Sequence, residues 1–343
     1  MNAEALQQTA QAMMAPGKGL LAMDESNPTC NKRFAALGIA QTPDMRRAYR
    51  ELIVNTPQLG QSISGAILFD ETMRQKLQDG TGFVAALVRA GIIPGIKLDQ
   101  GAKPLPEFPG EKVTEGLDGL PARVKEYVDM GAKFAKWRAV IALGQGIPTQ
   151  ACIAANAHVL ARYAAICQEG GLVPIVEPEV LMDGAHTLEQ CFAATERTLH
   201  EVFRQLVEQR VLLEGVILKP NMVLAGKDCP QQTTADEVAD ATVTCLLRTV
   251  PAAVPGIAFL SGGQPPQPAS ARLNAMHVRF ASKMPWTVTF SFSRAIQQPA
   301  LDAWAGHSAN VKKAQQILLH RARCNSAARR GQYNAEIEAA DKT

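Results

Sequence analysis

Short apolar segments alternate with amphipathic segments along the whole chain. Eight of the apolar segments are β-rich or continuously hydrophobic, a pattern typical of strands that are covered on both faces. They are Gly19–Asp24, Gly65–Phe69, Ile93–Asp99, Phe134–Ile141, Leu172–Glu177, Gly215–Lys219, Ile257–Ser261 and Thr287–Ser291. Helical patterns occupy the stretches between them, so the chain predicts an α/β protein in which strands and helices alternate.

Two of the predicted helices have recognisable limits. Thr234–Glu237 reads as a capping box, and an apolar-periodic run follows it through Val250. A second helical pattern covers His186–Arg210. Since no Pro/Gly/Ser-rich linker divides the chain, we predict one (β/α)8 TIM barrel over residues 1–343. A doubly wound sheet is the competing fold, but no GxGxxG motif follows the first strand.

Two segments are predicted to lie outside the regular elements. Pro104–Pro121 is rich in Pro, Gly and Glu and predicts a long surface loop with little structure. The last dozen or so residues, from about Gln332, predict a short polar tail.

Charged residues end or interrupt most of the apolar strands. Asp24 ends the first and Lys219 the sixth, while Lys97 with Asp99, Lys136 with Arg138, and Glu177 with Glu179 share a face, because side chains alternate along a strand. One such charge alone is most often a strand-end residue turned to solvent, and Asp24–Ser26 alone also suits a helix N-terminus. Recurrence in most strands predicts instead an active site at the carboxyl ends of the barrel strands.

Lys219 is the candidate nucleophile. It follows three apolar residues and precedes a proline, which predicts a lysine on a buried strand. Burial and a nearby cation such as Lys136 or Lys97 both favour the neutral amine, which is the nucleophilic form. A neutral amine beside a carboxylate suits Schiff-base formation with a ketone, and the protonated imine then accepts the electrons of a breaking carbon–carbon bond.

Two loops are candidates for phosphate binding. Ser261-Gly262-Gly263 follows the seventh strand, and the segment from Ser291 to Arg294 follows the eighth. These are the loops in which barrels often bind phosphate through backbone N–H groups, and an arginine adds bidentate contacts. Taken alone, Ser-Gly-Gly is most often only a turn.

Composition narrows the class of protein. The chain is 47% hydrophobic and carries a formal charge of only +3, which argues for a sizeable core and against a dedicated nucleic-acid binder. The N-terminus lacks a signal-peptide core, and no apolar stretch approaches membrane-spanning length, so we expect a cytoplasmic protein that binds no membrane. Seven cysteines without a CxxC pair predict reduced, buried thiols.

The histidines and the basic C-terminal region are given structural interpretations. His158, His186, His200, His277, His307 and His320 show no HxxH or HExxH spacing, so we expect helix-surface residues and no catalytic metal. The basic positions Lys312, Lys313, Arg321, Arg323, Arg329 and Arg330 predict a solvated helix face rather than a polyanion site.

Several strings together resemble the class I fructose-bisphosphate aldolases over nearly the whole chain, closest to their bacterial and plant-like branch. They are Gly17–Ser26, Gly95–Asp99, Phe134–Arg138, Val176–Glu179, Leu218–Met222, Phe259–Gln264 and Arg294–Gln297, in family order. The resemblance implies a (β/α)8 barrel that cleaves fructose 1,6-bisphosphate reversibly to two triose phosphates. It also implies that the reaction uses a lysine Schiff base and no cofactor.

The resemblance assigns roles by position. It implies that Lys219 forms the Schiff base, that Glu177 transfers protons, that Lys136 is its cationic partner, and that Asp24 positions Lys219 and the hydroxyl at the cleaved bond. The remaining implied contacts are with substrate. Ser261, Gly262 and Arg294 bind the phosphate at the ketone end, Lys97, Arg138, Lys32 and Arg33 lie around the other phosphate, and Ser26 and Glu179 complete the site.

The chain departs from the family pattern at two points. Animal members end in a tyrosine that assists proton exchange, whereas this chain ends in Asp341-Lys-Thr343 and its last tyrosine is Tyr333. Many relatives have glycine before the strand-eight arginine, where this chain has Ser293. The first change leaves the role of the tail open, and the second keeps a backbone N–H for phosphate.

Two other functions remain as alternatives. A transaldolase-like Schiff-base barrel would act on a monophosphate, and two basic clusters favour the bisphosphate instead. A non-catalytic barrel scaffold would be expected to lack Lys219, Lys136 or Glu177, and all three are present. By resemblance alone we expect a homo-oligomer, a tetramer, whose only other partners are small sugar phosphates.

Overall fold

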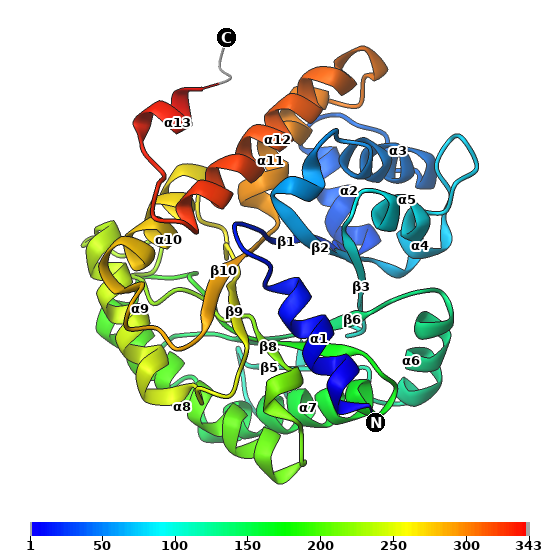
Figure 1. The fold of residues 1–343 in the computed structure, drawn as a ribbon. Coiled ribbons are helices and arrows are strands. Elements are labelled where there is room, and N and C mark those ends of the chain that lie inside the picture. The colour runs from blue at the N-terminus through cyan, green and yellow to red at the C-terminus, as the bar shows by residue number, and fades with distance from the viewer. Residues whose placement is uncertain (1, 341–343) are drawn as a thin grey trace.

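The computed structural model describes residues 2–340, and within them eight parallel strands close into a barrel (Figure 1). The strand order around the barrel is β1-β10-β9-β8-β7-β6-β3-β2. The strands are β1 Gly19–Met23, β2 Ile63–Leu68, β3 Ile93–Lys97, β6 Phe134–Ile141, β7 Val173–Val180, β8 Ile217–Leu218, β9 Gly256–Phe259 and β10 Thr287–Phe292. Each overlaps one predicted strand, so the predicted barrel is confirmed.

Helices surround the barrel and connect its strands (Figure 1). They are α1 Ala3–Met13, α2 Asn27–Ala35, α3 Pro43–Val54, α4 Asp70–Arg74, α5 Phe83–Arg89, α6 Leu120–Asp129, α7 Gln150–Glu169, α8 Leu188–Glu208, α9 Ala235–Thr249, α10 Pro266–Phe280, α11 Arg294–Trp304, α12 Val311–Ala328 and α13 Ala335–Ala339, with short 3-10 turns η1 Leu59–Gln61, η2 Leu213–Gly215 and η3 Ser308–Asn310. The predicted capping box is confirmed, because Thr234 and Glu237 exchange both hydrogen bonds at the start of α9.

The positions that face the barrel interior change from apolar to charged as each strand runs toward its carboxyl end. An apolar interior residue is followed two positions later by a charged one in four strands: Ala22 by Asp24, Phe134 by Lys136, Ile175 by Glu177, and Ile217 by Lys219. Strand register pairs Lys97 with Lys136 and Arg138 with Glu177, so charged residues of neighbouring strands lie side by side toward the carboxyl ends. Alternation along the strands therefore produces a charged mouth above an apolar interior.

Helix α1 closes the opposite mouth of the barrel (Figure 1). Its buried residues Leu6, Ala10 and Met13 pack with the interior strand residues in one hydrophobic cluster. The ring of Phe134 fills the interior beside Gly95, where a Cβ would lie 2.2 Å from the ring. Glycine at this position makes room for the aromatic side chain.

The predicted surface loop at Pro104–Pro121 is wrong in part. Strand β4, Ala102–Pro104, pairs antiparallel with β5, Lys112–Thr114, and α6 already begins at Leu120. The Thr114 hydroxyl donates to the Arg138 carbonyl at 2.8 Å, and Asn156 Nδ2 donates to the Lys112 carbonyl, also at 2.8 Å. These long-range hydrogen bonds order the segment without leaving a hydrophobic pattern in the sequence.

The predicted solvated face at the C-terminus is also wrong in part. Lys312, Lys313, Arg323 and Arg330 are exposed, but Arg321 and Arg329 are buried. Arg329 donates to the Met14 carbonyl at 2.8 Å and to further carbonyls just after α1. A buried arginine that satisfies carbonyls at a helix end has the same sequence signature as a solvated one.

Other expectations have mixed outcomes. All seven cysteines are buried, and none forms a disulfide within residues 2–340, as predicted. His186 is only 8% exposed and precedes α8, so a helix-surface position is wrong for it.

Within the predicted tail, α13 is helical, and residues 341–343 lie outside the described residues. No helix in the described part of the chain is long and apolar enough to cross a membrane.

Candidate active site

A cavity of about 570 Å³ opens at the carboxyl ends of the barrel strands. Every residue predicted for the site lines it: Asp24, Ser26, Lys32, Arg33, Lys97, Lys136, Arg138, Glu177, Glu179, Lys219, Ser261, Gly262 and Arg294. These residues come from strand ends and loops that are far apart in the sequence, and closure of the barrel brings them together.

The centre of the cavity is a chain of buried ion pairs. Lys219 Nζ lies 3.1 Å from Glu177 Oε1, and Lys136 Nζ lies 3.3 Å from Glu177 Oε2 and 2.7 Å from Asp24 Oδ2. The four side chains are at most 10% exposed. Glu177 thus lies between two amines, while its Oε2 accepts no geometrically aligned hydrogen bond from the described residues. One carboxylate oxygen is therefore available to a proton on a bound molecule.

Neighbouring charges determine the protonation state of two of these four ion-paired residues. Burial alone would raise the pKa of Asp24, but the Lys136 and Lys219 amines outweigh it and hold that pKa below its usual value. Burial would lower the pKa of Lys136, but Asp24, Glu177 and Asp99 outweigh it and raise that pKa above its usual range. Lys136 is therefore a permanent cation and Asp24 a permanent anion near neutral pH.

A second group of charges extends from the centre toward α6. Lys97 Nζ lies 2.6 Å from Asp99 Oδ1, and Arg138 Nε lies 2.5 Å from Glu179 Oε2. Asp99 Oδ2 also accepts the backbone N–H of Arg138 at 3.2 Å. Each cation in this group is oriented by its own carboxylate, which leaves its remaining N–H groups to contact an anion.

The loops after β9 and β10 meet beside the cavity. Gly262 and Gly263 have φ values of 59° and 100°, which favour glycine, and their turn follows the buried Ser261. A Cβ on Gly263 would lie 3.0 Å from Arg294 Nη2. Arg294 begins α11 and makes no ion pair within residues 2–340. Burial, and then the charge of Arg33, lower its pKa, as expected for an unneutralised guanidinium in an electropositive pocket.

Glu25 is a residue of the site that the sequence prediction missed. Its carboxylate lies 2.7 Å from Arg33 Nη1 and 2.5 Å from Arg50 Nη1, and it accepts hydrogen bonds from Ser293 Oγ at 2.5 Å and Gln297 Nε2 at 3.1 Å. Burial opposes ionisation, but the two arginines outweigh it and hold the pKa of Glu25 well below its usual range. Part of the charge of Arg33 is consequently neutralised. The only sign of this role in the sequence is that Glu25 directly follows Asp24.

The rim of the cavity is more exposed. Lys32 is exposed on α2, and Ser26 Oγ lies 3.0 Å from Thr29 Oγ1 at the start of that helix. Ser291, the first residue of the predicted phosphate-binding segment, also lines the cavity, as do Thr29 and Gln298, which were not predicted. Uncharged polar residues occur in every helix and loop, so their sequence positions alone did not distinguish them.

A closed (β/α)8 barrel with buried lysines among carboxylates defines a class of barrel enzymes with a polar site at the strand ends. A family model for class I fructose-bisphosphate aldolases matches residues 5–343. The chain belongs to the class I fructose-bisphosphate aldolase family.

Individual relatives agree with the family match. A protein of Xanthomonas axonopodis pv. citri, named as a probable fructose-bisphosphate aldolase class 1, is 56% identical over 97% of this chain and 99% of its own. A cytosolic fructose-bisphosphate aldolase of Arabidopsis thaliana is 51% identical over 96% of this chain and 92% of its own. The solved fructose-bisphosphate aldolase of Plasmodium falciparum superposes with a TM-score of 0.95, at 48% identity, over 97% of this chain and 96% of that one.

These matches confirm the family, the fold and the lyase activity expected from the sequence. The scaffold and monophosphate alternatives are not favoured by these matches.

Proposed function

We propose that Lys219 is the nucleophile with which this chain cleaves fructose 1,6-bisphosphate to dihydroxyacetone phosphate and glyceraldehyde 3-phosphate. The observation that carries the assignment is the chain of contacts from Lys219 through Glu177 and Lys136 to Asp24. Of the lysines in the cavity, Lys136 makes ion pairs with three carboxylates and stays charged, whereas Lys219 contacts Glu177 alone among the described acidic groups. Lys219 is therefore the lysine in this row of contacts that a single carboxylate holds.

The covalent step begins when the neutral amine of Lys219 attacks the substrate ketone. Glu177, 3.1 Å from that amine, takes up its proton and returns a proton to the departing oxygen, so that water leaves and an iminium forms. Lys136 holds Glu177 in place from the other side. The step neither consumes nor needs a metal, because the iminium itself withdraws electrons.

Carbon–carbon cleavage requires a base for the hydroxyl on the far side of the breaking bond. Asp24 and Glu177 Oε2 both face Lys136, and Glu177 Oε2 accepts no hydrogen bond from the described residues. Glu177 removes the hydroxyl proton while Asp24 orients the hydroxyl, the bond electrons move to the iminium, and the aldehyde product leaves. Protonation of the enamine and addition of water then release the ketone product and regenerate Lys219.

Two basic groups hold the two phosphates. Ser261, Gly262 and Arg294 bind the phosphate at the ketone end through backbone N–H groups and the guanidinium, as the barrel loops after strands seven and eight often do. Lys97, Arg138, Lys32 and Arg33, with Ser26, bind the other phosphate. Glu179 orients Arg138 at 2.5 Å. A substrate with one phosphate would leave one of these groups unused.

We further propose that the enzyme works in the cytoplasm as a homotetramer and takes only sugar phosphates as substrates. The cytosolic names of plant relatives support the compartment. The tetramer follows from the resemblance to the family alone.

The test is a coupled cleavage assay on the purified protein with and without EDTA. We expect cleavage of fructose 1,6-bisphosphate that EDTA leaves unchanged, with a lower kcat/KM for fructose 1-phosphate. Activity that EDTA abolishes, or a preference for the monophosphate, would contradict the proposed chemistry or the proposed use of two phosphate groups, respectively.

A further inference from the structure

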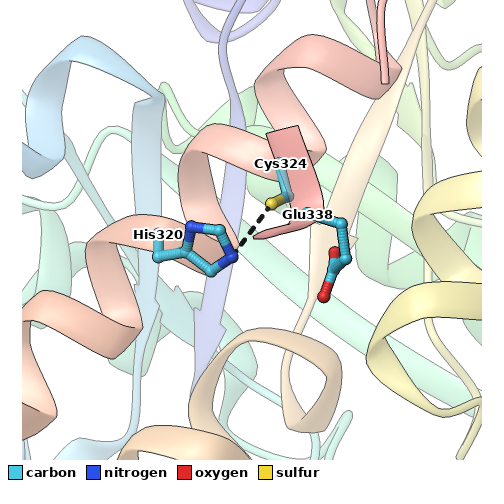
Figure 2. Close-up of side chains that lie close together, drawn as sticks. All are labelled: His320, Cys324 and Glu338. Carbon is cyan, nitrogen blue, oxygen red and sulfur yellow. Dashed lines mark hydrogen bonds between the residues drawn. The ribbon is translucent and has the colours of Figure 1, made fainter. Parts of the chain in front are cut away.

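Outside the active site, three side chains with metal-binding atoms come together on the two C-terminal helices. His320 and Cys324 lie on α12 and Glu338 lies on α13 (Figure 2). One donor atom from each, an imidazole nitrogen, the thiol sulfur and a carboxylate oxygen, lies within 4.8 Å of the other two. These residues do not line the aldolase cavity.

The pair on α12 already has the geometry of two ligands on one metal ion. Residues four apart share a helix face, and His320 Nε2 lies 3.5 Å from Cys324 Sγ along the dashed line in Figure 2. Tetrahedral zinc, with bonds of about 2.3 Å to sulfur and about 2.0–2.1 Å to nitrogen, separates two such ligands by about 3.6 Å. Cys324 is fully buried, so a metal bound there would be shielded on one side by the packing of the two helices.

Glu338 is held in place by three side chains. Its Oε2 accepts from Arg321 Nη1 at 2.5 Å and from the Tyr333 hydroxyl at 2.7 Å, and its Oε1 accepts from Gln267 at 3.1 Å. Metal-binding carboxylates are commonly oriented by such outer hydrogen bonds. Oε1 has the longer contact, with Gln267, and one carboxylate oxygen lies within 4.8 Å of the imidazole nitrogen and the sulfur.

We propose that His320, Cys324 and Glu338 bind one divalent cation of the zinc class, with water as the fourth ligand. The donor set of sulfur, imidazole nitrogen and carboxylate suits zinc or cobalt and disfavours magnesium and calcium, which prefer oxygen ligands alone. Binding releases the thiol proton of Cys324, and the resulting thiolate and carboxylate face the cation. The ion links α13 to α12, and the aldolase reaction proceeds without it.

Cobalt titration of the purified full-length protein tests the proposal. We expect one Co²⁺ per chain, a near-ultraviolet thiolate-to-cobalt absorption band, and loss of that band when Zn²⁺ is added. His320→Gln and Cys324→Ser should each weaken Co²⁺ binding by more than the roughly 10–100-fold that loss of an outer hydrogen bond costs, while Tyr333→Phe should fall within that range.

Matched variants separate this site from incidental binding. His200 is an exposed histidine on α8 and Cys229 is a cysteine distant from α12 in sequence, so His200→Gln and Cys229→Ser should leave the band and the affinity unchanged. Circular dichroism of each variant checks that it folds, and His320→Gln decides the outcome if Cys324→Ser does not. A wild-type protein without the band, or one whose band survives His320→Gln, would overturn the proposal.

Discussion

The two ends of the barrel interior are built from the same strands and have opposite chemistry. At the amino end, α1 packs Leu6 and Met13 against interior residues such as Ile217 and leaves no room for solvent. At the carboxyl end, Lys219 lies two residues beyond Ile217 on the same strand face, in a cavity lined with charges. A distance of two residues therefore separates the part of the strand that stabilises the fold from the part that we propose to react.

The two ends of the barrel interior contribute differently to the stability of the folded protein. Burial of apolar surface at the α1 end stabilises the fold, at roughly 25 cal/mol per Å². The charged end holds several ionised groups that are nearly inaccessible to solvent, and burial of ion pairs often contributes little or nothing to stability. Substitutions at the charged end should thus change rate first, whereas substitutions at the α1 end should change stability first.

Removal of the proposed proton carrier, Glu177, tests the charged end with the largest expected effect. Glu177→Gln keeps the shape of the side chain but cannot accept a proton, so we expect kcat to fall by about 10²–10⁴-fold. KM should change little, because the basic groups proposed to bind phosphate are intact. Steady-state kinetics measure both, with the exposed Glu208→Gln on α8 as the control. A kcat within about threefold of wild type would remove Glu177 from the mechanism.

Truncation of a buried side chain on α1 tests the apolar end of the barrel interior. Leu6 is 1% exposed, so Leu6→Ala should lower the free energy of unfolding by about 2–5 kcal/mol through lost burial and a cavity. The kcat of the folded fraction should not change. Urea unfolding and kinetics at low temperature measure the two quantities, and Leu247→Ala, at a position that is 47% exposed, should cost less than about 0.5 kcal/mol. If Leu6→Ala lowers kcat while stability is unchanged, the division between the two ends fails.

Acid should destabilise the protein through the charged end. The pKa of Glu25 lies below its ordinary value of 4.5 in the folded state, so the unfolded chain binds its proton first as pH falls. Its contribution to stability is present above pH 4.5 and is lost as the pH falls toward the folded pKa. Glu25→Gln should make the decline shallower by up to about 1.4 kcal/mol per pH unit. Urea unfolding at a series of acidic pH values measures the slope, and an unchanged slope would contradict the role of Glu25.

The smallest effect is expected at Ser293. Its hydroxyl donates to Glu25 and lies 3.4 Å from Arg33 Nη2, so Ser293→Ala should loosen Arg33. Loss of one hydrogen bond of about 1 kcal/mol predicts a rise in KM for fructose 1,6-bisphosphate of roughly fivefold, with kcat within twofold. Ser293→Thr, which keeps a hydroxyl, should restore the wild-type KM. Equal KM values for the alanine variant and wild type would mean that Ser293 does not position Arg33.

The strands and most of the candidate site could be predicted from the sequence, because both depend on the alternation of side chains between the two faces of a strand. Ile217 and Lys219 are two apart, so a buried strand with a charge at its end could be recognised without knowledge of its neighbours. Glu25 could not be placed in this way. It lies one position out of phase with Asp24, and its partners Arg50 and Gln297 come from α3 and α11, which only the folded chain brings together.

The same reason explains the errors elsewhere. Arg321 and Arg329 have the sequence pattern of a solvated helix, yet Arg321 pairs with Glu338 of α13 and Arg329 with carbonyls just after α1. The proposed metal site was not predicted because the HxxH and HExxH spacings leave out a cysteine partner such as Cys324, and because Glu338 lies on another helix. Periodic burial is recorded locally in a sequence, whereas polar contacts between distant elements are not.

Covalent trapping tests the central assignment most directly. The purified protein is incubated with dihydroxyacetone phosphate and sodium borohydride, which reduces an imine to a stable amine, and the modified peptide is located by mass spectrometry. The account predicts one adduct, on Lys219, with loss of cleavage activity and no adduct on Lys136 or in a Lys219→Met variant. An adduct on another lysine, or no adduct in an active enzyme, would contradict it.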